Sequence, residues 1–179
     1  HALDHMPEQY QIPGVLWGQR WVSTPACRAA RAAERERFRE VNHVVQYLFG
    51  DPVDQALEDF AELGQRLTVL GRFPERLPSA LVGPFHFLEG FASIPGVVSA
   101  EVVPFRPNRG AYLIIERPTD PARSDPTELH WSREQIAALL DVPGVAGVWL
   151  FAASPYYTHR RWDVGQHRVA ICYLDEVVE

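Results

Sequence analysis

The sequence contains no lysine, and all 17 of its basic residues are arginine. A Schiff-base aldolase and a pyridoxal phosphate enzyme are excluded, because both need a lysine amine. A Walker A nucleotide site is excluded for the same reason, since its lysine binds the phosphates. The absence of lysine therefore excludes several common enzyme classes.

Cysteine is scarce as well, with only Cys27 and Cys172 far apart in the chain. No CxxC pair exists, so neither a thiolate zinc site nor a redox dithiol is predicted. Cys172 sits in an apolar, strand-like run and is expected to be buried. We expect both thiols to be reduced and the protein to be cytoplasmic.

Long apolar runs are absent, so we expect no transmembrane helix, and the start lacks the pattern of a signal peptide. The net charge is −6, which argues against a chain that binds polyanions over its whole surface. We expect neither nucleic acid nor a membrane as a partner. The motifs GxSxG, GxGxxG and HExxH and the EF-hand pattern do not occur.

A Pro-Gly-Val turn occurs three times, at 12–15, 94–97 and 142–145. Pro-Gly favours a tight turn, and the β-branched residue after it favours an extended run. Strands are predicted after the three turns, and a second strand follows each, with one more before the second turn. The predicted strands are 16–22, 42–50, 84–91, 98–105, 110–117, 146–153 and 168–175.

Three helices are predicted between the strands. The first follows Asp51-Pro52, a cap and a first-turn proline, and ends at Gly71. The second spans 132–140, with Ser132 as cap and Gln135 at the capping-box position. The third, 28–40, holds five arginines and three glutamates and is polar all round, so a solvated helix or a lid is expected.

The order of the elements predicts an α+β fold built from antiparallel strands with helices on one face. It reads as two ferredoxin-like halves, residues 11–91 and 92–179, after a tail of residues 1–10 that we expect to lie outside the fold. The length of 179 residues allows either one domain or two small ones.

The Pro-Gly-Val turns, the paired strands and the strand endings with an aromatic and then an acidic residue resemble the dimeric α+β barrel superfamily. Polyketide cyclases, muconolactone isomerases, antibiotic-biosynthesis monooxygenases, chlorite dismutases and aldoxime dehydratases belong to it. The resemblance covers residues 12–175. It implies a homodimer with a cavity lined by one face of each sheet.

The first candidate site lies in the segment 42–50, where alternation places His43 and Tyr47 on one face. An imidazole near its ordinary pKa can both accept and donate a proton, so the two are a candidate acid/base pair. A strand-end histidine bonded to the backbone is the alternative.

The strongest candidate lies in the segment Phe85-His86-Phe87-Leu88-Glu89. Alternation puts His86 and Leu88 on one face and Glu89 on the other, so either His86 or Glu89 must face an apolar layer. A carboxyl in such a layer would suit proton abstraction from carbon. An edge strand with one solvated face is the alternative.

Aromatic and arginine side chains provide candidate ligand contacts. Trp17 shares a face with Gln19 and Trp21, while Arg20 lies on the opposite face and could bind a carboxylate or enolate. Trp149 is a second candidate wall of the cavity. Tyr157 is the substrate-binding candidate of the loop 154–166, whose spacing His159-x3-Asp163-x3-His167 is a weak metal signal, and we expect no metal.

Together these features predict a cofactor-independent lyase, isomerase or cyclase that transfers protons on a small hydrophobic carbonyl or aromatic, polyketide-like compound. His86 or Glu89 would be the base, and His43 or Tyr47 the partner acid. The resemblance supplies the reaction class, because a fold does not fix a function. The alternatives are a haem enzyme with an axial histidine and a binding barrel without chemistry.

Overall fold

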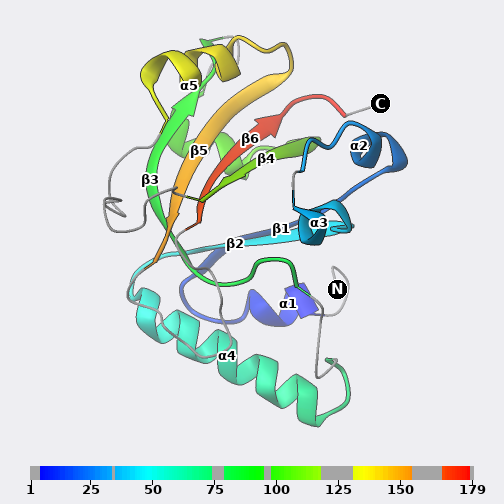
Figure 1. The fold of residues 1–179 in the computed structure, drawn as a ribbon. Coiled ribbons are helices and arrows are strands. Elements are labelled where there is room, and N and C mark those ends of the chain that lie inside the picture. The colour runs from blue at the N-terminus through cyan, green and yellow to red at the C-terminus, as the bar shows by residue number, and fades with distance from the viewer. Residues whose placement is uncertain are drawn as a thin grey trace. The chain divides into compact units, whose positions relative to one another are not determined.

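The computed structural model describes residues 5–33, 35–73, 79–94, 98–117, 131–154 and 167–177. They form an α+β fold with two antiparallel sheets, one of two strands and one of four (Figure 1). The chain divides into two compact units, His1–Ala80 and Leu81–Glu179. The boundary differs from the predicted one at 91/92, because the strand before that point pairs within the second unit.

The first unit contains a two-stranded antiparallel sheet and one long helix. Its strands and the long helix confirm the predicted elements to within a few residues. Helix α4 begins after Pro52, which occupies the cap position without a side-chain hydrogen bond, instead of after a capping Asp51. The elements are α1 (His5–Gln9), β1 (Val15–Val22), α2 (Pro25–Ala29), α3 (Glu36–Arg39), β2 (His43–Phe49) and α4 (Val53–Val69).

The core of the first unit lies between α4 and one face of the β1–β2 sheet. Leu63 and Leu67 of α4 pack with Ile12, and Phe60 makes edge contacts with Tyr47 and Phe49. The spacing of these side chains at three and four residues is what places them on one face of the helix.

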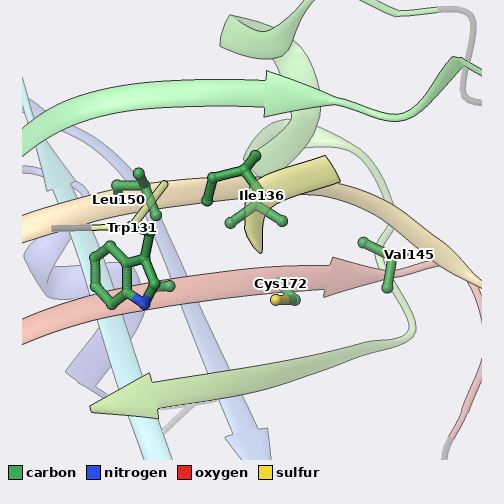
Figure 2. Close-up of a cluster of buried hydrophobic side chains, with 7 residues drawn as sticks. Trp131, Ile136, Val145, Leu150 and Cys172 are labelled. Carbon is green, nitrogen blue, oxygen red and sulfur yellow. The ribbon is translucent and has the colours of Figure 1, made fainter. Parts of the chain in front are cut away.

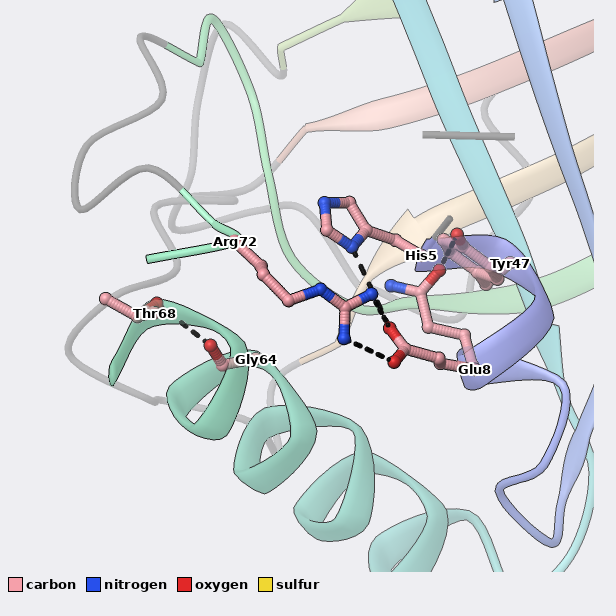
Figure 3. Close-up of polar contacts among 7 residues, drawn as sticks. His5, Glu8, Tyr47, Gly64, Thr68 and Arg72 are labelled. Atoms are coloured by element: carbon pink, nitrogen blue, oxygen red, sulfur yellow. Dashed lines mark hydrogen bonds and ion pairs between the residues drawn. The ribbon is translucent and has the colours of Figure 1, made fainter. Parts of the chain in front are cut away.

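Helix α1 belongs to this core, which corrects the expectation of a tail for residues 5–10; residues 1–4 lie outside the described residues. Met6 and Gln9 of α1 are buried. Glu8 of α1 forms an ion pair of 2.7 Å with Arg72, just beyond the end of α4 (Figure 3). His5 packs edge-on against Phe73 at 5.5 Å between ring centroids. Apolar burial and one ion pair therefore tie α1 to the C-terminal end of α4.

The single helix predicted over 28–40 is wrong: the structure has the two short helices α2 and α3 instead. The guanidinium of Arg31 donates to the carbonyl oxygens of Phe38, Arg39 and Val41 at 2.6–2.9 Å. These bonds fold the segment back on itself, and a continuous helix would keep those carbonyls out of reach of Arg31.

The second unit contains a four-stranded antiparallel sheet in the order β3-β5-β6-β4. The four strands confirm those predicted at 84–91, 110–117, 146–153 and 168–175. The elements are β3 (Phe85–Ala92), η2 (Ala100–Phe105), β4 (Gly110–Glu116), α5 (Arg133–Leu140), β5 (Val145–Ala153) and β6 (Arg168–Leu174).

The strand predicted at 98–105 is wrong, because this segment forms the 3₁₀ helix η2. Pro104 lies inside it and has no N–H to donate to a sheet. Val103 is fully buried, and a Cβ added to Gly147 of β5 would lie 2.8 Å from it. The apolar residues of the segment therefore cover β5 instead of extending the sheet.

Helix α5 covers the other face of this sheet, as its predicted capping box allows. Ser132 accepts a hydrogen bond from the Gln135 N–H, and the Gln135 side chain accepts one from the Ser132 N–H. Beneath the helix lies a cluster of buried side chains (Figure 2), comprising Trp131, Ile136, Val145, Val148, Leu150, Ala170 and Cys172.

Two of the three Pro-Gly-Val turns are visible and confirm the predicted turns. Gly14 and Gly144 have φ values of +88° and +85°, which glycine adopts without a steric penalty. In each turn the valine N–H donates over 3.1 Å to the carbonyl of the first residue, Ile12 or Val142. In the second copy, at 94–97, residues 95–97 lie outside the described residues.

No helix in the described part of the chain is both long enough and apolar enough to cross a membrane.

Candidate functional site

Polar side chains gather at one end of the four-stranded sheet. The strand register aligns His86 of β3 with Ala152 of β5, Ala152 with Arg168 of β6, and Arg168 with Glu116 of β4. Residues that lie opposite one another in antiparallel strands project from the same face. His86, Arg168 and Glu116 therefore share a face, with only the small Ala152 between the histidine and the arginine.

His86 and Ser154 form a polar contact at this end of the sheet. The Ser154 Oγ atom lies 3.0 Å from His86 Nε2. Ser154 follows β5 directly and is only 5% exposed, and its backbone N–H donates to the carbonyl of Pro84 at 3.2 Å. The serine is thus anchored at its backbone, and its hydroxyl fixes the orientation of the imidazole.

Arg168 adds a buried positive charge to the same row, since it is only 3% exposed. Neighbouring strands lie about 4.8 Å apart, so the Cα atoms of His86 and Arg168, two strands apart, are separated by about 10 Å. Their side chains leave the sheet on the face that carries Ala152.

Glu89 does not occupy the position that alternation predicted. The pairing of β3 with β5 shifts between Phe87 and Glu89, so Glu89 lies opposite Leu150. This β-bulge moves Glu89 to the face that carries His86, whereas the sequence analysis placed the two on opposite faces. Glu89 forms a 3.3 Å ion pair with Arg133 of α5, so it faces a guanidinium and no longer fits a base in an apolar layer.

His43 and Tyr47 share a face of β2 as predicted, and they belong to the first unit, whereas His86 belongs to the second. His43 is exposed at the strand end. Tyr47 donates its hydroxyl hydrogen bond to the Gln9 side chain (Figure 3), and burial raises its pKa. A tyrosine with a raised pKa that packs on Phe60 serves the core of its unit.

The residues predicted to contact a ligand do not all lie in the same unit. Trp17 and Arg20 occupy opposite faces of β1, as predicted. Trp149 is buried in the second unit, where its indole N–H donates to the Ala100 carbonyl at 2.7 Å and its ring lies 4.4 Å from that of Phe87. These contacts fix η2 on the sheet. Tyr157 lies outside the described residues.

The haem alternative requires a histidine ring nitrogen as the axial ligand of the iron, and it stays a prediction. Among the described residues, no group of three or more His, Cys, Asp and Glu is placed to hold a metal ion. The His159-x3-Asp163-x3-His167 spacing was the weak metal signal in the sequence, and its residues His159 and Asp163 lie outside the described residues.

The serine and the arginine of the polar row were not among the residues predicted from the sequence. Arg168 appeared only as the first residue of a predicted strand, and Ser154 as the first residue of a loop. The sequence does place a polar residue at the same end of several strands. These residues can be predicted to lie in one row only when the register of the four strands is known.

The two cysteines are expected to react very differently with a thiol reagent. The Thr24 hydroxyl donates to the Cys27 sulfur over 3.2 Å, and this bond lowers the Cys27 pKa. Burial raises the Cys172 pKa to about 11. Since the thiolate is the nucleophile, iodoacetamide at pH 7.5 should label Cys27 alone in the folded protein and both in urea. Mass spectrometry of the tryptic peptides checks this, and equal labelling of the folded protein would contradict it.

Comparison of the chain with family models, with curated proteins and with solved structures finds no significant match. Any statement about function therefore rests on the residues themselves.

Proposed function

We propose that this chain is a cofactor-independent enzyme that transfers a proton on a small carbonyl compound, with His86 as the base. The observation that carries the proposal is the 3.0 Å contact between His86 Nε2 and Ser154 Oγ, in a row with the buried Arg168. Lyase, isomerase and cyclase reactions share this first step.

Each side chain has a defined part in the proposed reaction. His86 takes a proton from the carbon next to the carbonyl, and the electron pair moves to the carbonyl oxygen as an enolate. The Arg168 guanidinium stabilises that oxygen, and its burial strengthens the interaction. The imidazolium then returns the proton to the same or another carbon, or to a leaving group. Ser154 positions the imidazole.

The charge of Glu116 fits this arrangement. It lies directly opposite Arg168 in the β4–β6 pairing, and opposite charges across a strand pair favour each other. In the proposed site, Glu116 would balance the charge of Arg168 when no substrate is bound. Glu89, the base that the sequence favoured beside His86, is assigned to the ion pair with Arg133 and takes no part.

The test is deuterium exchange at carbon. A panel of small ketones, β-keto acids and aromatic carbonyl compounds is incubated with the protein in D₂O, and loss of the α-proton signal is followed by NMR. The expected result is exchange above the buffer rate for at least one compound. A protein that exchanges no proton in any of them, even one that it binds, would overturn the proposal in favour of a binding module.

We also propose that the two units are ferredoxin-like and that two copies of the chain assemble into a dimeric α+β barrel. In support, an α-helix packs on each sheet, α4 in the first unit and α5 in the second, and apolar side chains such as Trp17 and Phe151 lie on the face opposite that helix. Native mass spectrometry is expected to give twice the chain mass of 20.3 kDa. A monomer at micromolar concentration would contradict the dimer.

A further inference from the structure

Three arginines surround a hollow in the first unit, far along the chain from the polar row of the second. The hollow has a volume of about 390 Å³ and lies in the segment that joins β1 to β2. This volume is within the usual range for small-molecule sites. Its walls are Arg28, Arg31, Ala32, Ala33 and Arg39.

Hydrogen bonds to the backbone fix all three guanidinium groups. Arg31 uses both terminal nitrogens, donating to three carbonyl oxygens and to the Ser23 hydroxyl. Arg28 donates from one terminal nitrogen to the Ser23 carbonyl at 2.8 Å, and Arg39 donates from Nε to the Ala33 carbonyl at 2.8 Å. Arginines held in place in this way lose less conformational entropy when they bind a ligand.

Among the described residues, no carboxylate pairs with the remaining N–H groups of two of these arginines. Arg28 keeps Nε and one terminal nitrogen, and Arg39 keeps both terminal nitrogens; among the described residues none of these atoms has a hydrogen-bond partner. Neither Glu36 nor Glu40, the described acids of this segment, forms an ion pair with them. Three like charges gathered around one hollow repel one another, and a bound anion relieves this repulsion.

We infer that this hollow binds a small molecule with a phosphoryl group, held by Arg28 and Arg39 beside the fixed charge of Arg31. A phosphoryl dianion offers three acceptor oxygens to donors on separate arginines, whereas a carboxylate is satisfied by one guanidinium. The positive charge is local, because the chain as a whole carries −6. The site is independent of the reaction proposed for His86.

Phenyl phosphate is the probe, titrated into the full chain by isothermal titration calorimetry, with benzoate as the carboxylate control. Saturable binding of phenyl phosphate that is stronger than that of benzoate is expected. Arg28→Ala and Arg39→Ala should each weaken it by about 10- to 100-fold, the range for a hydrogen bond to a charged group. Arg66→Ala, which removes an equal charge from the exposed face of α4, should leave it unchanged.

Three results would overturn the inference. They are an absence of saturable binding, equal weakening by Arg66→Ala, and tighter binding of a short single-stranded oligonucleotide than of phenyl phosphate. The circular dichroism spectrum of each variant verifies that the chain has folded. Arg31 is left intact because its four hydrogen bonds hold the segment together.

Discussion

Replacing His86 with Gln is expected to lower the rate of deuterium exchange by about 10²- to 10⁴-fold, the usual contribution of a general base. Glutamine is close to histidine in size, and its amide can keep a hydrogen bond to the Ser154 hydroxyl, which lies 3.0 Å from the imidazole. An amide cannot accept a proton from carbon at neutral pH. The fold should therefore survive while the reaction is lost.

Further variants separate a catalytic loss from a structural one. Ser154→Ala removes the group that positions the imidazole, so the rate should fall less than with His86→Gln. Returning the hydroxyl as Ser154→Thr should recover part of that loss, which a purely structural defect would not do. Glu101→Gln on η2 changes an exposed carboxylate to an amide and should leave the rate unchanged.

The outcome that contradicts the assignment is a rate that is unaffected by His86→Gln. A rate that falls only with His43→Gln would move the site to the exposed end of β2, where the sequence placed the second histidine. The two histidines lie in different units, so a single pair of variants decides between them.

Most of the secondary structure could be predicted because alternation and spacing are local properties of the sequence. The strands from Val145 and from Arg168 and the capping box at Ser132 follow directly from neighbouring residues. The segment 98–105 has the same apolar character as a strand, but it forms η2. Local pattern does not distinguish a strand from an apolar segment that covers a sheet.

The candidate site was harder to predict, because it depends on contacts between distant residues. His86 and Ser154 are 68 residues apart in the chain, and a β-bulge after Phe87 decides on which face Glu89 lies. A bulge of one residue reverses every later position in a strand. The sequence therefore singled out His86 without its contact to Ser154, since it could show neither the bulge nor the strand register.

Replacing Leu150 with Ala is expected to reduce the free energy of unfolding by about 2–5 kcal/mol, the range for a buried leucine. Leu150 is 0% exposed and belongs to the cluster beneath α5 (Figure 2). It lies on a central strand opposite Ala170, whose small side chain cannot fill the space that the leucine would leave. Urea denaturation measures the change, and Val69→Ala, at a position that is 88% exposed, should stay within about 0.5 kcal/mol.

The same variant tests whether the core holds the site in place. Leu150 lies two residues before Ala152 on β5, on the same face of the sheet. In the proposed site, His86 and Arg168 would bind a substrate beside Ala152. A cavity at Leu150 loosens the strands that set their separation, and catalytic geometry tolerates only small displacements. Leu150→Ala should therefore slow exchange well below its unfolding transition, whereas Leu63→Ala, in the core of the first unit, should reduce stability and leave the rate of the folded protein unchanged. Equal losses of rate in both variants would show that the polar row is not the site.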